Sequence, residues 1–299
     1  MHRRYPFVPI TDRPDFTWPE GRRLAVYIGL NLETFRFGGG LGAELAPGGP
    51  QPDVLNYAWR DYGNRVGAFR MADLFDTLGL PLSVLVNSNL YDDCPGLVER
   101  FRARGDEIVG HGRTNSERQG VLPEEEERAL IEEATVRIGR AEGQRPNGWL
   151  GPWISQSAVT PDLLKEAGYA YLLDWCHDDQ PVWFETRSGP ILSVPYPQEL
   201  NDIPMIVGRK MDAAPFADMI IDNFEEMLAQ SSGEPLVMGI ALHPYLFGQP
   251  YRLRHLRRAL EKIRALSDER VWWTTAGAIA GHFKTAVPPN PKAFVSQSQ

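Results

Sequence analysis

The sequence predicts an α/β fold, a deformed parallel (β/α) barrel of about seven strands surrounded by helices. Short apolar, β-prone segments alternate with amphipathic helical segments along most of the 299 residues. The joins between them are mostly short, and neither an internal repeat nor a linker divides the chain. An open, doubly wound parallel sheet is the alternative for the same alternation.

The strands are predicted from short apolar segments, because a helix that spans a domain needs a longer segment. In chain order they are residues 24–31, 82–86, 108–110, 147–150, 191–196, 236–242 and 271–274. Apolar residues at helical spacing predict helices over 63–78, 95–104, 123–143, 161–168, 216–228 and 252–266. Prolines open two of these helices, and glycines close several of them.

One domain spanning residues 1–299 is the expected organisation, with a core of about 18–285 between an N-terminal arm and a polar C-terminal tail. The Gly/Pro-rich stretch from Gly38 to Pro52 predicts a long exposed loop. This loop offers a route to self-association, so a homo-oligomer stays open.

Composition excludes some classes of function. The net charge of −8 argues against a nucleic-acid-binding surface. No apolar run reaches the length of a membrane span, and none follows the basic start as in a signal peptide. The two cysteines, Cys94 and Cys176, suggest neither a metal motif nor a disulfide framework. We therefore expect a cytoplasmic protein whose partner is a small-molecule substrate.

Three candidate catalytic residues follow predicted strands. Glu33, His111 and His243 are far apart in the sequence, but the carboxyl ends of barrel strands converge at one face. Amide hydrolysis needs a base for water, an acid for the departing nitrogen and a donor for the oxyanion. We assign these roles to Glu33, His243 and His111 in that order. A pocket of Leu32, Phe35 and Trp149 is expected to raise the pKa of Glu33.

At these strand ends the chain resembles the polysaccharide deacetylase superfamily (NodB-like, carbohydrate esterase family four), and more specifically its metal-independent allantoinase-like branch. The resemblance covers about Trp18 to Trp273. It is carried by the ordered segments Leu30-Asn31-Leu32-Glu33, Tyr62-Gly63-Asn64-Arg65-Val66-Gly67, Gly110-His111-Gly112, Asp178-Asp179-Gln180-Pro181-Val182-Trp183, Asn201-Asp202, Leu242-His243 and Gly248-Gln249-Pro250.

The resemblance implies hydrolysis of N-acetyl or cyclic amide groups. It places Glu33 at the catalytic base and His243 at the general acid, and His111 matches the first histidine of the metal motif. Thr34 and Asn115 stand where metal-dependent members carry a second aspartate and a second histidine. No tightly bound cofactor is therefore expected. If zinc binds, Glu33, His111 and Asn115 are the candidate ligands.

The predicted substrate-binding residues come from these strand ends and motifs. Arg65 and Arg113 are candidate clamps for a carbonyl or carboxylate. The full predicted set is Arg65, Arg113, Asn115, Trp149, Asp178, Asp179 and Asp202.

Three hypotheses for function follow. The leading one is a metal-independent hydrolase of a small amide or ureide. The second is a metal-dependent N-deacetylase of amino sugars or polysaccharide with an altered ligand set. The third is a barrel that has lost catalysis and retains a binding pocket for a metabolite or glycan.

Overall fold

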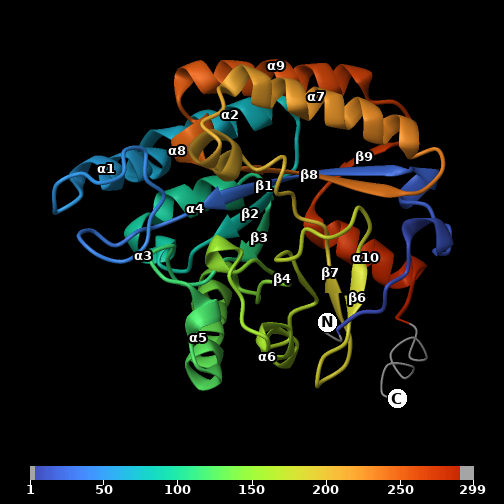
Figure 1. Ribbon diagram of the computed structural model, residues 1–299, viewed down its shortest axis with the longest axis horizontal. Coiled ribbons are helices and arrows are strands. Elements are labelled where there is room, and N and C mark those ends of the chain that lie inside the picture. Colours follow the sequence, from blue (N-terminus) through green and yellow to red (C-terminus); the bar gives the residue numbers. More distant parts are fainter. Residues whose placement is uncertain (1–3, 290–299) are drawn as a thin grey trace.

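The computed structural model describes residues 4–289, and within this range nine strands form one curled sheet (Figure 1). The strands are β1 (Leu24–Leu32), β2 (Ser83–Val86), β3 (Glu107–Gly110), β4 (Gly148–Trp149), β5 (Tyr171–Leu172), β6 (Val182–Phe184), β7 (Ile191–Ser193), β8 (Leu236–Leu242) and β9 (Val271–Thr274). The hydrogen-bonded order is β6-β7-β5-β4-β3-β2-β1-β8, and β9 pairs with β1. Every pair is parallel except β6 with β7.

Helices cover the outside of the sheet. The α-helices are α1 (Val54–Tyr62), α2 (Ala68–Leu78), α3 (Leu90–Asp93), α4 (Pro95–Arg102), α5 (Glu124–Glu142), α6 (Thr160–Glu166), α7 (Ala213–Gln230), α8 (Pro244–Phe247), α9 (Pro250–Leu266) and α10 (Ala276–Ala286). Five other helical segments are short: η1 (Ile10–Asp12), η2 (Pro19–Gly21), η4 (Gln119–Val121), η5 (Pro152–Ile154) and the π-helical η6 (Ile203–Gly208). A further π-helical turn, η3 (Gly63–Gly67), joins α1 to α2.

Backbone contacts link the two ends of the strand order, β8 at one end and the segments that flank β6 and β7 at the other. The Val237 amide of β8 donates to the Asp179 carbonyl at 2.8 Å, and the Ala241 amide donates to the Leu200 carbonyl at 2.9 Å. Asn201 also forms an isolated parallel bridge with Ala241. The connections around β7 therefore complete the deformed barrel, and the predicted fold class is confirmed.

Alternation along the strands separates the barrel interior from the helix layer, since neighbouring residues of a strand face opposite sides. In β1, Leu24, Val26 and Ile28 pack in the apolar cluster that contains residues of α2, α7 and α9, which lie above the strand in Figure 1. Ala25 and Tyr27 pack in a second cluster with residues of β2 and β3. The odd-numbered residues of β1 thus face the interior.

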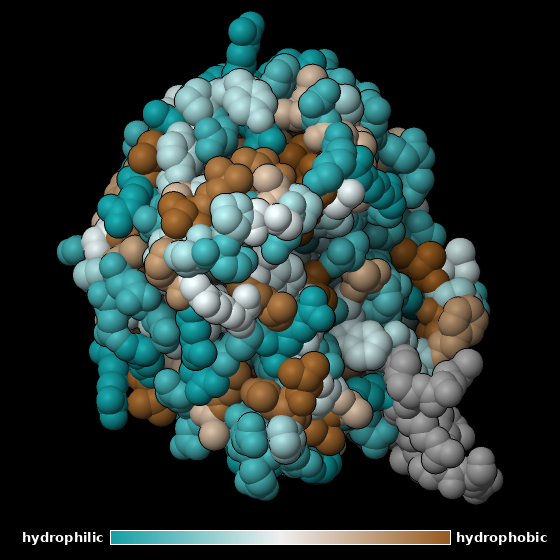
Figure 2. All heavy atoms as spheres, turned by 60° about the vertical axis from the view of Figure 1, so that its left-hand side comes forward, coloured by the Kyte–Doolittle hydropathy of each residue, from teal (hydrophilic) through white to brown (hydrophobic). Residues whose placement is uncertain are grey.

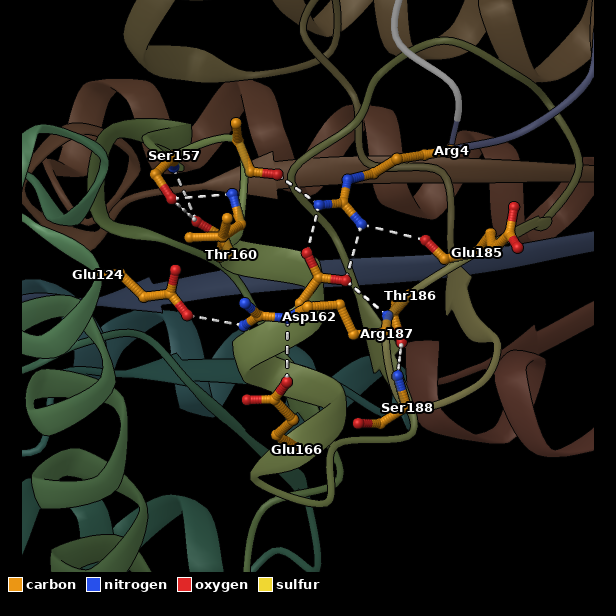
Figure 3. A network of polar contacts seen from close by, with 12 residues as sticks. Arg4, Glu124, Ser157, Thr160, Asp162, Glu166, Glu185, Thr186, Arg187 and Ser188 are labelled. Atoms are coloured by element: carbon orange, nitrogen blue, oxygen red, sulfur yellow. Dashed lines mark hydrogen bonds and ion pairs between the residues drawn. The ribbon is translucent and has the colours of Figure 1, made fainter. Parts of the chain in front are cut away.

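A polar network ties the N-terminal segment to one side of the barrel (Figure 3). Arg4 pairs with Asp162 of α6 at 2.6 Å and donates to the Glu185 carbonyl at 3.0 Å. The Arg187 amide donates to the same aspartate at 2.8 Å, and the Arg187 guanidinium pairs with Glu124 of α5. These contacts connect α5, α6 and the β6–β7 hairpin.

The face of the molecule in Figure 2 is mostly hydrophilic. Figure 2 shows hydrophobic side chains in separate patches on one face rather than as one continuous area. Within residues 4–289, none of the helices combines the length and apolar character needed to cross a bilayer.

Some elements differ from the sequence-based expectation. The first predicted helix, 63–78, begins earlier at Val54 and passes through η3. The sequence analysis did not predict β5, β6, α3, α8 or α10. The first four are four residues or shorter, and α10 is rich in Ala and Gly, so its apolar stripe is weak. The expected polar tail lies largely outside the described residues.

Candidate active site

The strand register brings polar side chains together at the carboxyl ends of the central strands. Leu32 of β1 pairs with Val86 of β2, which in turn pairs with Gly110 of β3. One residue further along, the same register puts Glu33, Asn87 and His111 side by side. The residues before them, Leu32, Val86 and Gly110, occupy outward-facing positions of their strands. Since neighbouring residues of a strand alternate in direction, Glu33, Asn87 and His111 face the barrel interior.

β8 adds His243 to this group. Its Leu242 pairs with Leu30 of β1, so His243 follows next to Asn31. Val237 and Ala241 belong to the interior cluster, and His243 continues their face. Glu33, His111 and His243 are all at least nine-tenths buried. The predicted convergence of an acid and two imidazoles is therefore present in the structure.

Glu33 lies between the two imidazoles. Its Oε1 is 3.4 Å from His243 Nε2 and 3.6 Å from His111 Nε2, and it accepts a hydrogen bond from the Asn115 side-chain amide. Its Oε2 accepts the Tyr245 hydroxyl at 3.0 Å. Oε1 is thus the oxygen that faces both histidines.

The tautomer of His111 follows from its buried partner. Nδ1 lies 2.7 Å from the Leu150 carbonyl oxygen, which only accepts, so Nδ1 carries a proton. In the neutral ring Nε2 is then a bare acceptor. It is buried and has no hydrogen-bond partner among residues 4–289. A neutral His111 therefore accepts at Nε2, and only the imidazolium form donates there, as the expected role of oxyanion donor requires.

A relay through Asn87 fixes the orientation of the Asn115 amide. The Thr34 backbone N–H donates to Asn87 Oδ1 at 2.8 Å, so this end of the Asn87 amide is the acceptor and the other end is the donor. That end, Nδ2, donates to the His111 carbonyl and to Asn115 Oδ1. Asn115 must then present its N–H₂ group to Glu33.

His243 is paired with Asp202, the aspartate that begins the π-helical turn η6. Asp202 Oδ1 lies 2.6 Å from His243 Nδ1, and its Oδ2 accepts the His243 backbone N–H at 2.8 Å. Asp202 is fully buried. The pair orients the imidazole so that Nε2 points at Glu33.

The pKa values of Glu33 and His243 move apart. Burial acts to raise the pKa of Glu33, but the charge of His243 and the two imidazoles beside the carboxylate lower it to about 2. Burial acts to lower the pKa of His243, but Asp202 and Glu33 raise it to about 10. At neutral pH the site therefore holds a carboxylate and an imidazolium. The expected raised pKa for Glu33 is wrong, because its neighbours are imidazoles and hydrogen-bond donors rather than an apolar wall.

These groups lie in a cavity of about 200 Å³. Its other walls come mainly from loops beyond the strand ends. The cavity is lined by Asn31, Glu33, Phe35, Ala43, His111, Asn115, Leu150, Trp153, Ile154, Tyr196, Gln198, Asn201, Ile203, Pro204, His243 and Tyr245. Such a volume is below the ~300–1,000 Å³ of drug-sized sites, so it suits a small ligand.

Known proteins share this sequence pattern and fold. The polysaccharide deacetylase family matches residues 57–172. A Schizosaccharomyces pombe protein grouped by name with the polysaccharide deacetylases is 27% identical over 276 residues, which is 87% of this chain and 85% of that protein. The crystal structure of a probable polysaccharide deacetylase from Pseudomonas aeruginosa PAO1 is 27% identical, with a TM-score of 0.83 over 93% of this chain and 97% of that chain. This chain is similar to the polysaccharide deacetylases in sequence and in fold.

A second solved structure, that of PuuE allantoinase, matches equally well. It is 27% identical, covers 96% of this chain and 99% of its own, and gives a TM-score of 0.83. The fold is thus shared by solved structures that carry different names.

Many polysaccharide deacetylases use a divalent metal, and the residues present here do not fit one. The Thr34 hydroxyl donates to Asp93 at 3.2 Å, and Asn115 presents N–H groups, which are not metal ligands. At neutral pH the Nε2 of His243 carries a proton. Nowhere in residues 4–289 do three or more His, Cys, Asp or Glu side chains form a group arranged to hold a metal.

Six of the seven predicted substrate-binding residues do not line this cavity, and Asn115 is the exception. Asp202 is fully buried against His243 rather than in the cavity wall. Trp149 is fully buried on the opposite face of β4, where its indole packs on Tyr169 and donates to Gln119. Arg65 is largely exposed and pairs with Asp61.

The other three also have partners elsewhere. Arg113 forms ion pairs with Glu117 and Glu133 at 2.9 Å each. Asp178 pairs with Arg13 of the N-terminal segment at 2.5 Å. Asp179, its neighbour in the chain, lines an apolar cavity beside that segment rather than the one at Glu33. None of the three lines the candidate active site.

Sequence reasoning missed several residues of the cavity wall and of the hydrogen-bond network behind it. Asn31 is an interior polar residue of an otherwise apolar strand, and Asn87 follows β2 as Glu33 follows β1. Both positions were visible in the sequence as polar interruptions at strand ends. Tyr245, two residues after His243, gave no such signal, because a tyrosine at the start of a helix is commonly a packing residue.

Proposed function

We propose that this protein hydrolyses a non-peptide carbon–nitrogen bond in a small cyclic amide or ureide related to allantoin, without a tightly bound metal. The similarity to polysaccharide deacetylases supports the reaction class, and the match to PuuE allantoinase supports the substrate class. The observation that carries the proposal is the Glu33 carboxylate held between two imidazoles in a cavity of about 200 Å³.

Glu33 and His111 are the groups that hold the attacking water. A water between them donates one hydrogen to Glu33 Oε1 and the other to the bare Nε2 of His111. Its oxygen then faces the substrate carbonyl carbon. As the water attacks, one proton passes to Glu33 and the new C–O bond forms.

His243 supplies the proton that the departing nitrogen needs. Its imidazolium Nε2–H donates to that nitrogen as the C–N bond breaks, while Asp202 stabilises the charged ring. Glu33 then returns its proton to His243 across the 3.4 Å that separates Oε1 from Nε2. The water has supplied OH to the carbonyl carbon and H to the nitrogen.

Substrate binding adjusts the acid and the base. In the free protein the opposite charges stabilise each other, which makes the carboxylate a weak base and the imidazolium a weak acid. A substrate between Glu33 and His243 weakens their attraction. Both pKa values then move towards neutrality, where proton transfer is efficient.

The proposal is tested with a panel of allantoin, hydantoin, a cyclic imide and N-acetylated amino sugars, followed by ¹H NMR. We expect turnover of a cyclic ureide or imide that survives chelation and metal removal, and loss of at least about 10³-fold in Glu33→Gln and His243→Ala. Glu142→Gln is the control, since that carboxylate also accepts a tyrosine hydroxyl but lies away from the cavity.

Three outcomes would contradict the proposal. Turnover restricted to N-acetyl sugars, abolished by chelation and restored by zinc, would favour the metal-dependent deacetylase. Turnover unchanged in both the Glu33 and His243 variants would remove the site assignment. Tight binding of a ureide without turnover would favour a binding protein.

A further inference from the structure

The two oxygens of the Glu33 carboxylate have different surroundings. Oε1 faces the cavity and both imidazoles, whereas Oε2 accepts the hydroxyl of Tyr245 at 3.0 Å. Tyr245 is 3% exposed and comes from α8, directly after the strand that carries His243. The mechanism above uses Oε1 alone and leaves the purpose of the Oε2 contact open.

We propose that Tyr245 is a positioning residue whose hydroxyl occupies Oε2, so that the Glu33 carboxylate is held in one orientation with Oε1 free for proton transfer. The kinetic consequence rests on the proposed function, but the contact itself does not. A donor on a carboxylate oxygen favours the ionised form. Tyr245 therefore helps to keep Glu33 ready as a base at the pH of catalysis.

Aromatic packing fixes the position of the phenol. The Tyr245 ring contacts Trp59 edge to face, with centroids 4.9 Å apart, and contacts Phe35 in the same way at 6.2 Å. Burial and the Glu33 charge both raise the pKa of Tyr245 well above its usual value, so the hydroxyl keeps its proton and remains a donor.

Glycines in the turn η3 allow α8 to approach closely enough for this contact. A Cβ on Gly63 would lie 2.7 Å from the Tyr245 backbone nitrogen and 3.0 Å from its Cβ. A Cβ on Gly67 would lie 2.2 Å from the Pro244 carbonyl oxygen, and one on Gly248 would lie equally close to the Gly67 Cα. Real side chains do not tolerate such contacts, so these glycines set the distance between η3 and α8.

The same turn also holds the backbone of Glu33. Asn64 of η3 donates its side-chain amide to the Glu33 carbonyl at 2.7 Å. One π-helical turn thus fixes the Glu33 main chain directly and the Glu33 carboxylate through Tyr245. Such π-helical turns are rare and often occur at functional sites. The glycine-containing motifs of the sequence, 62–67 and 248–250, gain a physical role in this way.

Carbon-13 NMR titration of Glu33 tests the proposal directly. The Cδ signal is assigned by its loss in Glu33→Gln and followed from pH 2 to 7, while circular dichroism monitors folding. We expect Tyr245→Phe to raise the onset of protonation by about one pH unit. At pH 3, about a tenth of Glu33 is protonated in the wild type and about half in the variant.

Tyr171→Phe is the matched control. Its hydroxyl donates to Glu107 at 2.7 Å in the buried interior, away from the cavity. This variant loses the same kind of hydrogen bond and should leave the Glu33 titration unchanged. The proposal is overturned if Tyr245→Phe titrates like the wild type, or if Tyr171→Phe shifts the titration equally.

A second pair of variants tests the glycine contact. Gly63→Ala should displace α8 and reproduce the titration shift of Tyr245→Phe. Gly139→Ala is the control, since its added Cβ in α5 would have no contact closer than 3.6 Å. An unshifted titration in folded Gly63→Ala would refute this part of the proposal.

Kinetics give an independent measurement. With a turned-over ureide, Tyr245→Phe should lower kcat about tenfold or more with little change in KM, because the phenylalanine ring keeps its place in the cavity wall while Glu33 loses a hydrogen bond. If no ureide is hydrolysed but the titration shifts as expected, the proposed function fails while the role of Tyr245 in holding Glu33 stands.

Discussion

Replacing Asp202 by asparagine removes the charge that holds His243 as an imidazolium. Asp202 accepts from both the Nδ1 and the backbone N–H of His243, at 2.6 and 2.8 Å. In Asp202→Asn the side-chain oxygen accepts a hydrogen bond from one of these donors. The new N–H₂ group faces the other donor and cannot accept its hydrogen. We expect the variant to fold but to lose most of its activity at neutral pH.

The magnitude follows from the pKa of His243, which is raised from 6.5 to about 10 against the effect of burial. That shift of about 3.5 units corresponds to about 5 kcal/mol in favour of the charged ring. Asp202 is the largest of the groups that raise this pKa, and Glu33 is the next. Loss of the Asp202 charge should therefore lower the pKa by roughly two units or more.

The assay combines imidazole titration by NMR with the pH dependence of kcat/KM. We expect the basic limb to move down by at least two units and kcat at pH 8 to fall by about 10²-fold or more. Asp106→Asn is the matched control, because this buried aspartate also accepts a backbone N–H and pairs with a cation, Arg104, but lies near the amino ends of the strands. A basic limb that stays in place in Asp202→Asn would refute the reasoning.

Three further predictions follow from the charges and walls of the site. The free energy of unfolding that ionised Glu33 contributes should be lost as the pH falls from 4.5 through about 2. The contribution of protonated His243 should be lost as the pH rises from 6.5 through about 10. Urea unfolding at pH 3, 5.5 and 9 measures both effects, and a free energy of unfolding that is the same at all three would contradict the prediction. Arg65→Ala and Arg113→Ala should each change kcat/KM less than about threefold, since both guanidinium groups have carboxylate partners outside the cavity. Trp153→Ala should raise KM more than it lowers kcat, because the indole forms part of the cavity wall.

The catalytic group was predictable because β1 and β8 are long and regular. With period-two alternation, nine residues in β1 and seven in β8 fix which face Glu33 and His243 occupy. The parallel register then determines that these ends meet. His111 follows the shorter β3 by the same rule.

The wrong predictions concern residues of very short strands or residues outside strands, where the alternation rule gives little information. β4 has only two residues, so the sequence could not show that Trp149 faces the helices while Leu150 faces the interior. The partners of Arg65 and Arg113 lie one helical turn away or on a neighbouring helix, and a strand-end argument does not consider them. The tautomer of His111 depends on a carbonyl 39 residues away in the chain.

The immediate partners of Glu33 explain how the proposed chemistry avoids an inert ion pair. Apart from His243, they are neutral in their ordinary forms: the Asn115 amide, the Tyr245 phenol and His111. An arginine at hydrogen-bond distance would hold the carboxylate ionised whether or not substrate was present. Arg60, a buried cation close to the cavity, instead lies 4.5 Å over the Phe35 ring and donates to the Ala43 carbonyl. The charge of Glu33 therefore depends mainly on one movable proton, that of His243, and a substrate that separates the two residues can change the basicity of Glu33.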